Sequence, residues 1–279
     1  MSSQADGSGE VAGSSRISPT ANYTGEVWVR NGLSDGALAT AQGRVLYDVV
    51  RPLGALTGIV GWPSLERYLL GRHRTIDALL AAAIDAGEVS QVIEVAAGLS
   101  GRGLRFARRY GTALTYVETD LPAMAARKLE RLRLAGVDPL DATHRVAAVD
   151  ALRTGGDHSL EALAATLDPG RGLAVITEGL LSYLPLSDVT ALWRRIATML
   201  GGFVTGRYLT DIHLAVDETV PVRVFAAALG VFVGGSVSAH VDDAAGAIAA
   251  LRAAGFADAR LESPDRLVHI LEASTAPRA

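Results

Sequence analysis

A turn built from small residues follows the first apolar run that predicts a β-strand. The run at residues 91–97 passes into Gly98, and Gly101 follows within the same turn. A strand that ends in small residues lets the backbone approach a ligand closely at the carboxyl edge of a parallel sheet. Glu118 and Asp120 stand at the end of the next predicted strand, where a carboxylate can accept hydrogen bonds from both hydroxyls of a ribose. The spacing therefore favours a ligand that contains a nucleoside.

Two features separate the nucleoside ligands that such a turn could bind. The turn carries Glu94 within its strand and lacks the G-x-G-x-x-G spacing that seats a pyrophosphate on a helix N-terminus. The chain also closes with a pattern that predicts an antiparallel hairpin, at residues 259–262 and 267–272. Both features favour S-adenosylmethionine over a dinucleotide, and a nicotinamide-dependent oxidoreductase is the alternative on fold grounds.

The elements that position these residues alternate regularly along the chain. Short, almost continuously apolar runs predict strands at residues 91–97, 114–118, 144–149, 172–178 and 202–209. Helical patterns lie between and after them, at residues 103–110, 121–135, 159–167, 187–200 and 242–254. This alternation predicts an α/β fold with a doubly wound, mainly parallel sheet covered on both faces. The expected fold class is the Rossmann-like class I methyltransferase fold, with the sheet ending in an antiparallel hairpin.

The segments outside this alternation of strands and helices indicate the domain organisation. Residues 1–18 are rich in Ser and Gly and are interpreted as a disordered leader. Residues 19–279 are expected to form one domain, in which residues 19–87 make a helical lid or cap. An insertion at residues 211–240 follows the fifth strand and is expected to lie on the substrate side.

Composition excludes several classes of protein. The chain has 279 residues, 49% of them hydrophobic, with a net charge of −4 and a mean hydropathy of +0.26. The acidic balance argues against a nucleic-acid partner, and no apolar run reaches the roughly 20 residues that a membrane-spanning helix needs. The absence of Cys excludes disulfides, thiolate metal sites and a Cys nucleophile, and no metal site is predicted. These properties suggest a cytoplasmic enzyme or binding protein.

Five ordered motifs give the chain a family resemblance. They are TANYT at 20–24 with Trp28, RHRTID at 72–77, EVAAGLS at 94–100, YVETDLP at 116–122 and EGLLSYLP at 178–185. In these motifs the chain resembles the leucine carboxyl methyltransferase family, and within it the bacterial polyketide O-methyltransferases of the tetracenomycin type. The resemblance implies the class I fold and S-adenosylmethionine as cofactor, with S-adenosylhomocysteine as product.

The resemblance also implies roles for individual residues. Gly98 would let the backbone pass beside the cofactor, Asp120 would bind the ribose, and Asp150 with the backbone N–H of Ala151 would contact the adenine. Glu178 would lie near the methionine end, and Arg74, or Arg72 before it, would pair with the methionine carboxylate. The expected cofactor set also includes Tyr23, Glu94, Ala96 and Leu121.

Two positions in this region carry further expectations. Ala96 stands where many relatives have Gly, and it should fit if the turn keeps a negative φ there. Tyr23 and Trp28 suggest that residues 20–31 fold over the cofactor as a lid.

The same residues have structural alternatives. Asp120 and Asp150 could cap helices, Glu178 could be a solvated loop acid, and Arg72 and Arg74 could belong to the polar face of a helix. Arg131 and Arg133 are interpreted as a solvated helix face.

The acceptor side is expected beyond the fourth and fifth strands. The candidates there are Tyr183, Arg207, Tyr208, Asp211, His213 and His240. Arg207 is placed at the end of the fifth strand, where it could hold a substrate carboxylate, while His213 and His240 are candidate general bases for a phenol.

The resulting prediction is an O-methyltransferase that acts by direct in-line transfer on a carboxyl or hydroxyl group of a small, apolar, polyketide-like acceptor. The alternatives are a methyltransferase-fold enzyme that catalyses a non-methylating step such as a cyclisation, and a protein-carboxyl methyltransferase. The sequence leaves a monomer and a homodimer equally open.

Overall fold

The structure, a computed structural model, describes residues 19–59, 64–137, 142–217, 240–266 and 268–278. The predicted leader at residues 1–18 and most of the predicted insertion at residues 211–240 therefore lie outside the described residues.

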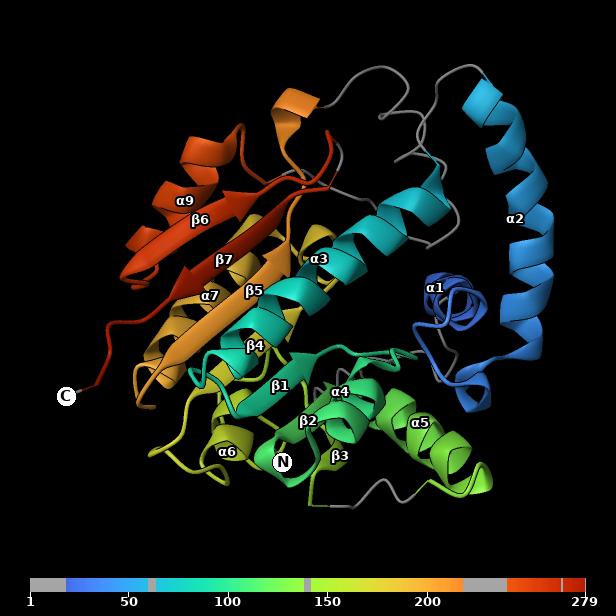
Figure 1. The fold of residues 1–279 in the computed structure, drawn as a ribbon. Coiled ribbons are helices and arrows are strands. Elements are labelled where there is room, and N and C mark those ends of the chain that lie inside the picture. The colour runs from blue at the N-terminus through green and yellow to red at the C-terminus, as the bar shows by residue number, and fades with distance from the viewer. Residues whose placement is uncertain (1–18, 60–63, 138–141, 218–239, 267, 279) are drawn as a thin grey trace, which may run out of the picture.

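One seven-stranded sheet forms the centre of the molecule (Figure 1). Its strands run in the order β3-β2-β1-β4-β5-β7-β6. The first five strands pair in parallel, and β7 pairs antiparallel with both β5 and β6. The strands are β1 (Gln91–Val95), β2 (Thr115–Asp120), β3 (His144–Ala148), β4 (Leu173–Thr177), β5 (Gly206–Asp211), β6 (Asp258–Glu262) and β7 (Ile270–Ser274). This order confirms the predicted doubly wound sheet with its terminal antiparallel hairpin.

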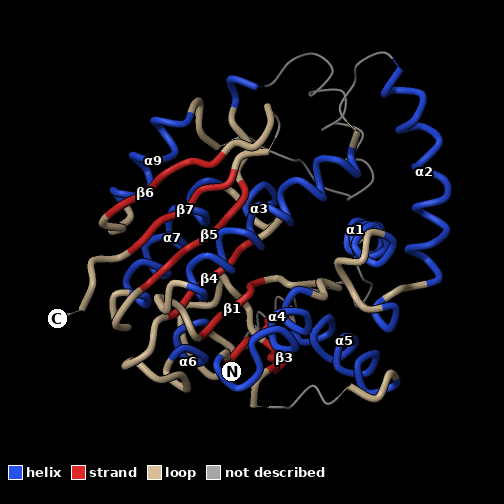
Figure 2. Tube along the Cα trace, in the orientation of Figure 1, coloured by secondary structure: helices blue, strands red, loops and turns tan. Residues whose placement is uncertain are grey.

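Helices cover both faces of the sheet (Figures 1 and 2). The helices that follow the first strand are α4 (Arg102–Tyr110), α5 (Pro122–Leu134), α6 (Leu160–Ala164), α7 (Leu186–Leu200) and α9 (Ala244–Ala253). Helices α6, α7 and α9 share one apolar core with the sheet, which includes the buried residues Trp193 and Val175. Helices α3 (Leu65–Asp85) and α4 pack on the opposite face, in a core that includes the fully buried residues Ile76 and Tyr116. Every residue of β1 and β4 is buried, which agrees with their largely apolar sequences.

The N-terminal helices divide into two groups. Helix α3 contacts β5 and β7 and belongs to the cover of the sheet. Helices α1 (Pro19–Arg30) and α2 (Ala41–Ile59) pack on each other beyond that cover, joined by the short helix η1 (Gly36–Leu38). In Figure 1 both lie at one side of the molecule, near the ends of the strands that carry the predicted site. The other short helices are η2 (Gly111–Ala113), η3 (Leu181–Tyr183) and η4 (Ala215–Asp217).

Within the described residues, no helix has both the length and the apolar character that crossing a membrane would require.

Candidate active site

Acidic residues gather at the carboxyl edge of the parallel strands. Asp120 ends β2, Asp150 follows β3, Glu178 follows β4 and Asp211 ends β5. Since parallel strands end at one edge of a sheet, these carboxylates meet beside the small-residue turn after β1. The sequence predicted Asp120, Asp150 and Glu178 for the cofactor and included Asp211 among the acceptor candidates.

The side chain of Asp120 links the end of β2 to the turn after β1 by a hydrogen bond. Its Oδ2 accepts a hydrogen bond of 2.8 Å from the backbone N–H of Gly98, and its Oδ1 accepts one of 2.8 Å from Leu121. Burial raises the pKa of this carboxyl, and the two backbone donors oppose that shift. The helix-cap alternative is wrong for Asp120, because the N-cap of α5 is Leu121 and no side chain caps that helix.

The turn itself requires left-handed backbone at two positions. Gly98 has a φ of +51° and Ala96 a φ of +53°. The expectation that Ala96 keeps a negative φ is therefore wrong. Among the described residues, Ala96 is the only one other than glycine with a positive φ. Left-handed backbone costs an L-residue about 1–2 kcal/mol, which indicates that the surrounding contacts impose this shape.

We expect Ala96→Gly to raise the free energy of unfolding by about 0.5–1 kcal/mol, because glycine adopts a left-handed backbone without strain. The larger conformational entropy of glycine in the unfolded state offsets part of this stabilisation. Urea denaturation measures the change. Ala97→Gly is the matched control: Ala97 is buried and has no positive φ, so this variant should be less stable than the wild type. A loss of stability in Ala96→Gly equal to that of the control would contradict the prediction.

Arg102 occupies the centre of a buried ion network behind the turn. It is completely buried at the start of α4, and its guanidinium bonds the carboxylates of Asp77, Glu94 and Glu178. His73 also belongs to the network, with its Nδ1 2.9 Å from Glu178 Oε2. Three segments distant in sequence, α3, β1 and the end of β4, are thereby held together at the edge of the sheet.

Glu94 acts inside this network. One of its oxygens accepts a bond of 2.6 Å from Arg102, and the other accepts a bond of 2.8 Å from the Tyr116 hydroxyl. Both carboxylate oxygens of Glu94 are hydrogen-bonded within the protein and the residue is buried, so Glu94 has a structural role in the site. Its assignment as a direct cofactor ligand is therefore corrected. Arg102 was not among the predicted site residues, although an arginine between Gly101 and Gly103 was a visible signal in the turn.

Helix α3 presents Arg72 to the site and Arg74 to solvent. The Nε of Arg72 lies 2.9 Å from Glu178 Oε1, and its Nη1 lies 3.1 Å from Asp211 Oδ2. Gly179 makes room for this approach, since a Cβ there would lie 2.8 Å from Arg72 Nη2. Arg74 is exposed. Of the two arginines that the sequence left open, the structure brings Arg72 to the carboxyl edge.

Glu178 is ionised at neutral pH. Burial by itself would raise the pKa of its carboxyl, but His73, Arg102 and Arg72 outweigh burial and hold that pKa well below the usual range. The solvated-loop alternative for Glu178 is wrong, because its side chain is only 4% exposed. A charged pair of Glu178 and Arg72 can meet an ammonium and a carboxylate carried by one ligand.

Helix α1 lies over the first turn. The ring of Trp28 stands 4.7 Å from that of His73, and a Cβ on Gly25 would lie 3.0 Å from Leu99. Tyr23 is buried and stacks on Tyr47, with ring centroids 6.1 Å apart. Close contact between α1 and the turn thus depends on a glycine in the helix and on its buried aromatic face.

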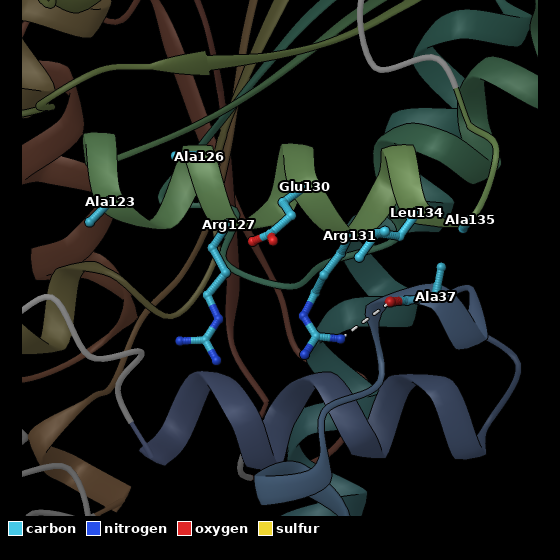
Figure 3. A pocket seen from close by; sticks show the side chains of 8 residues that line it. All are labelled: Ala37, Ala123, Ala126, Arg127, Glu130, Arg131, Leu134 and Ala135. Atoms are coloured by element: carbon cyan, nitrogen blue, oxygen red, sulfur yellow. Dashed lines mark hydrogen bonds between the residues drawn. The ribbon is translucent and has the colours of Figure 1, made fainter.

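Two arginines stabilise the segment that follows α1 through hydrogen bonds to its backbone carbonyls. Arg105 donates to the carbonyl of Leu33 at 2.8 Å, and Arg131 donates to the carbonyl of Ala39 at 2.6 Å. Figure 3 shows Arg127 and Arg131 projecting from the same side of α5 at a surface hollow of about 680 Å³, with Arg131 directed toward Ala37. None of the residues predicted for the cofactor or the acceptor lines this hollow. Arg131 therefore holds the segment after α1 in place and is not part of a purely solvated face. Arg133 is exposed, as predicted.

These contacts make the lid hypothesis testable by proteolysis. We expect S-adenosylhomocysteine to slow tryptic cleavage after Arg30, at the end of α1, since ligand beneath a covering segment stabilises its closed state. Arg252 on α9, exposed and distant from the edge, is an internal control whose cleavage should stay unchanged. Equal cleavage rates after Arg30 with and without the ligand would count against the lid.

Two of the acceptor candidates meet beside Arg72. Tyr183 and His213 line a small cavity together with Tyr23 and Tyr68. His240 lies next to η3, where its Nε2 stands 3.1 Å from the carbonyl of Leu181.

The predicted position of Arg207 at the carboxyl end of the fifth strand is wrong. The fifth strand runs over Gly206–Asp211 and not over residues 202–209, so Arg207 lies at its amino end. There it bonds Glu272 at 2.7 Å and also Glu88, on the edge of the sheet opposite to the site. The predicted role of Arg207 in holding a substrate is therefore corrected to a structural one.

Two further candidates have local structural contacts. Tyr208 is fully buried and bonds Thr177, so it belongs to the core of the sheet. Asp150 accepts a bond of 3.0 Å from the backbone of Leu152, which shapes the turn after β3, and Ala151 is partly buried beside it.

Comparison with known proteins identifies the family. The profile named Leucine carboxyl methyltransferase matches residues 50–197, slightly more than half of the chain. The chain belongs to the leucine carboxyl methyltransferase family. A protein of Rhodococcus jostii (strain RHA1), provisionally named an S-adenosyl-L-methionine-dependent methyltransferase, is 38% identical over 50% of this chain and 47% of its own length. The chain therefore spans about half the length of that relative. Family membership confirms S-adenosylmethionine as the cofactor.

Solved structures agree on the fold. A DUF574 family protein of Streptomyces avermitilis superimposes with a TM-score of 0.63 at 13% identity, over 94% of this chain and 100% of that one. A provisionally named methyltransferase of Thermobifida fusca gives a TM-score of 0.62 at 14% identity, over 94% and 96% of the two chains. At such identities the likeness shows the class I fold alone.

Proposed function

We propose that this chain is a cytoplasmic S-adenosylmethionine-dependent O-methyltransferase whose acceptor is a carboxyl or hydroxyl oxygen of a small, largely apolar, polyketide-like molecule. The observation that carries the proposal is the convergence of Gly98, Asp120, Asp150 and Glu178 on one edge of the sheet, beside buried Arg72. This set of residues spans the polar groups of the cofactor, from its adenine to its amino acid.

The residues present suit the cofactor. Among the described residues, a Cβ built on Gly98 would meet only Ala21, at 3.9 Å, so the backbone edge can approach a ligand closely. Asp120 would bind the ribose, and Asp150 with the N–H of Ala151 would contact the adenine. Ionised Glu178 and Arg72 offer opposite charges to the ammonium and the carboxylate of the methionine portion.

When bound, the cofactor supplies an electrophilic methyl group carried on a sulfonium. The protein then has to align the acceptor oxygen with that methyl group and to exclude water. Tyr23 and Trp28 on α1 serve the second task by covering the edge, and Tyr183 and His213 border the space in which the acceptor oxygen would lie.

The direct test is mass spectrometry after incubation of the protein with S-adenosylmethionine and a panel of aromatic acids and phenols. A product in which one methyl replaces a hydrogen, formed together with an equal amount of S-adenosylhomocysteine and lost in Asp120→Ala, is expected. Turnover of the panel without methyl consumption would contradict the proposal and would support a non-methylating enzyme such as a cyclase.

A further inference from the structure

His73 is a completely buried histidine on α3, directly behind the carboxylate of Glu178. Its Nδ1 lies 2.9 Å from Glu178 Oε2, and its Nε2 lies 3.1 Å from Nη2 of Arg105 on α4. The ring of Trp28 on α1 packs against the imidazole, with ring centroids 4.7 Å apart. One imidazole thus connects the acid that follows β4 with the helix that covers the turn.

The neighbours of the two ring nitrogens determine where the imidazole carries its proton. Glu178 is an acceptor, so a proton on Nδ1 gives it a hydrogen bond, whereas a bare Nδ1 would set two lone pairs against each other. Arg105 is a permanent donor, so Nε2 has to accept from it. The carboxylate of Asp77 lies 3.9 Å from Nε2, beyond hydrogen-bond distance. The neutral tautomer with Nδ1–H therefore satisfies both close contacts, and the Nε2–H tautomer satisfies neither.

A second guanidinium near Nδ1 is compatible with this tautomer. Nη2 of Arg102 lies 2.8 Å from Nδ1, but its two hydrogens have other acceptors, Glu178 Oε2 at 2.5 Å and the carbonyl oxygen of His73 at 3.5 Å. Nη2 of Arg105 divides its two hydrogens between Nε2 and Asp77 Oδ2, the latter at 2.5 Å. Both guanidinium nitrogens that face the imidazole thus find an acceptor for each hydrogen when His73 is neutral and protonated on Nδ1.

This arrangement fixes the carboxylate of Glu178. Its Oε2 accepts from His73 and from Arg102, which fills the two acceptor positions of that oxygen. Its Oε1 accepts from Arg72 Nε at 2.9 Å, the one bond that it receives within the part of the chain that the structure describes. Oε1 therefore keeps one acceptor position for a donor that a ligand brings.

We propose that His73 is a positioning residue for the cofactor, which turns Oε1 of Glu178 toward the ammonium of the methionine portion. This inference rests on the proposed function, in which Glu178 meets that ammonium. His73 acts through Glu178 and not by touching the ligand. Its Nε2 is held by Arg105, which also donates to the carbonyl of Leu33 at 2.8 Å, so the orientation of Glu178 depends on the segment that follows α1.

Two ligands separate this role from a general contribution to folding. S-adenosylhomocysteine carries the ammonium, whereas 5′-methylthioadenosine has the same nucleoside and thioether without the amino acid. Calorimetry compares both ligands on the wild type, His73→Asn and His73→Gln. The Asn amide nitrogen can replace Nδ1–H, while Gln places its amide at the position of Nε2. We expect His73→Gln to bind S-adenosylhomocysteine at least about tenfold more weakly and His73→Asn to stay within about threefold of the wild type. The affinity for 5′-methylthioadenosine should change by less than about threefold in both variants.

Three results would overturn the positioning role. They are a parallel loss of affinity for both ligands in His73→Gln, an unchanged affinity of His73→Gln for S-adenosylhomocysteine, and a loss in His73→Asn as large as that in His73→Gln. Failure of the wild type to bind either ligand would instead remove the proposed function, and this inference with it.

A second measurement leaves the buried histidine in place. NMR of the imidazole nitrogens in the wild-type protein should show His73 protonated on Nδ1 alone. Arg105→Met removes the donor to Nε2, so the Nε2–H tautomer should appear and the affinity for S-adenosylhomocysteine should fall by about threefold or more. Arg109→Met, at an exposed position of the same helix, should change neither. A proton on Nε2 in the wild type, or an unchanged tautomer in Arg105→Met, would contradict the proposal.

Discussion

Replacing Arg102 with methionine is expected to lower the free energy of unfolding by about 3–5 kcal/mol at neutral pH. Methionine fills a similar apolar volume but leaves Asp77, Glu94 and Glu178 without the cation that joins them. All three carboxylates are at most 15% exposed, so water cannot take over the role of the guanidinium. The loss is measured by urea denaturation followed by circular dichroism.

Arg108→Met is the matched control for this variant. Arg108 lies on the same helix, is 59% exposed and bonds Asp35 at the surface, so its loss should cost no more than about 1 kcal/mol. If the two variants lost equal stability, the network around Arg102 would not hold the edge of the sheet together.

The effect of Arg102→Met should also depend on pH in a defined direction. Burial would raise the pKa values of Asp77 and Glu178, but their cationic neighbours outweigh burial and lower both in the folded wild type. Depressed carboxyl pKa values contribute stability that is present above the unfolded-state pKa, near 4, and is lost as pH falls. The stability gap between wild type and Arg102→Met should therefore be fully present near pH 7 and shrink as the pH falls below about 4. A gap that widened on acidification would contradict this account.

Replacing Arg72 with glutamine should weaken binding of S-adenosylhomocysteine by about 30- to 100-fold. The loss of a charge-assisted pair with the methionine carboxylate corresponds to about 2–3 kcal/mol. Removal of the cation also leaves Glu178 and Asp211 facing each other, which further opposes the approach of an anionic group. Isothermal calorimetry on the purified variant measures the change in affinity.

Arg74→Gln decides between the two arginines that the sequence left open. Arg74 lies two residues further along α3 and is exposed, so its replacement should change the affinity by less than about twofold. A large loss of affinity in Arg74→Gln with none in Arg72→Gln would reverse the assignment made from the structure.

The parts of the site that the sequence predicted are those that depend on strand order. Asp120, Asp150 and Glu178 follow apolar runs, and the ends of parallel strands meet at one edge whatever the details of packing. The terminal hairpin was predicted for a similar reason, because two short runs separated by turn residues pair locally. Family motifs added the roles of these residues.

The parts that the sequence did not predict depend on registers and contacts between distant segments. A shift of the fifth strand from residues 202–209 to Gly206–Asp211 moved Arg207 from the carboxyl end to the amino end. The inward direction of Arg72 follows from the packing of α3 on the sheet, which a two-residue spacing cannot reveal. Arg102 bonds residues of three different elements, so its role becomes visible only when those elements are assembled.

The central claim is that the carboxyl edge of this sheet binds S-adenosylmethionine through Asp120. Calorimetry with S-adenosylhomocysteine on the wild type and on Asp120→Ala tests it most directly, with Asp157→Ala, a change at an exposed acid, as the control. The account predicts one ligand per chain for the wild type and the control, and an affinity about 100-fold lower for Asp120→Ala, since two hydrogen bonds from the ribose to a charged acceptor are lost. No binding by the wild type, or equal binding by folded Asp120→Ala, would contradict it.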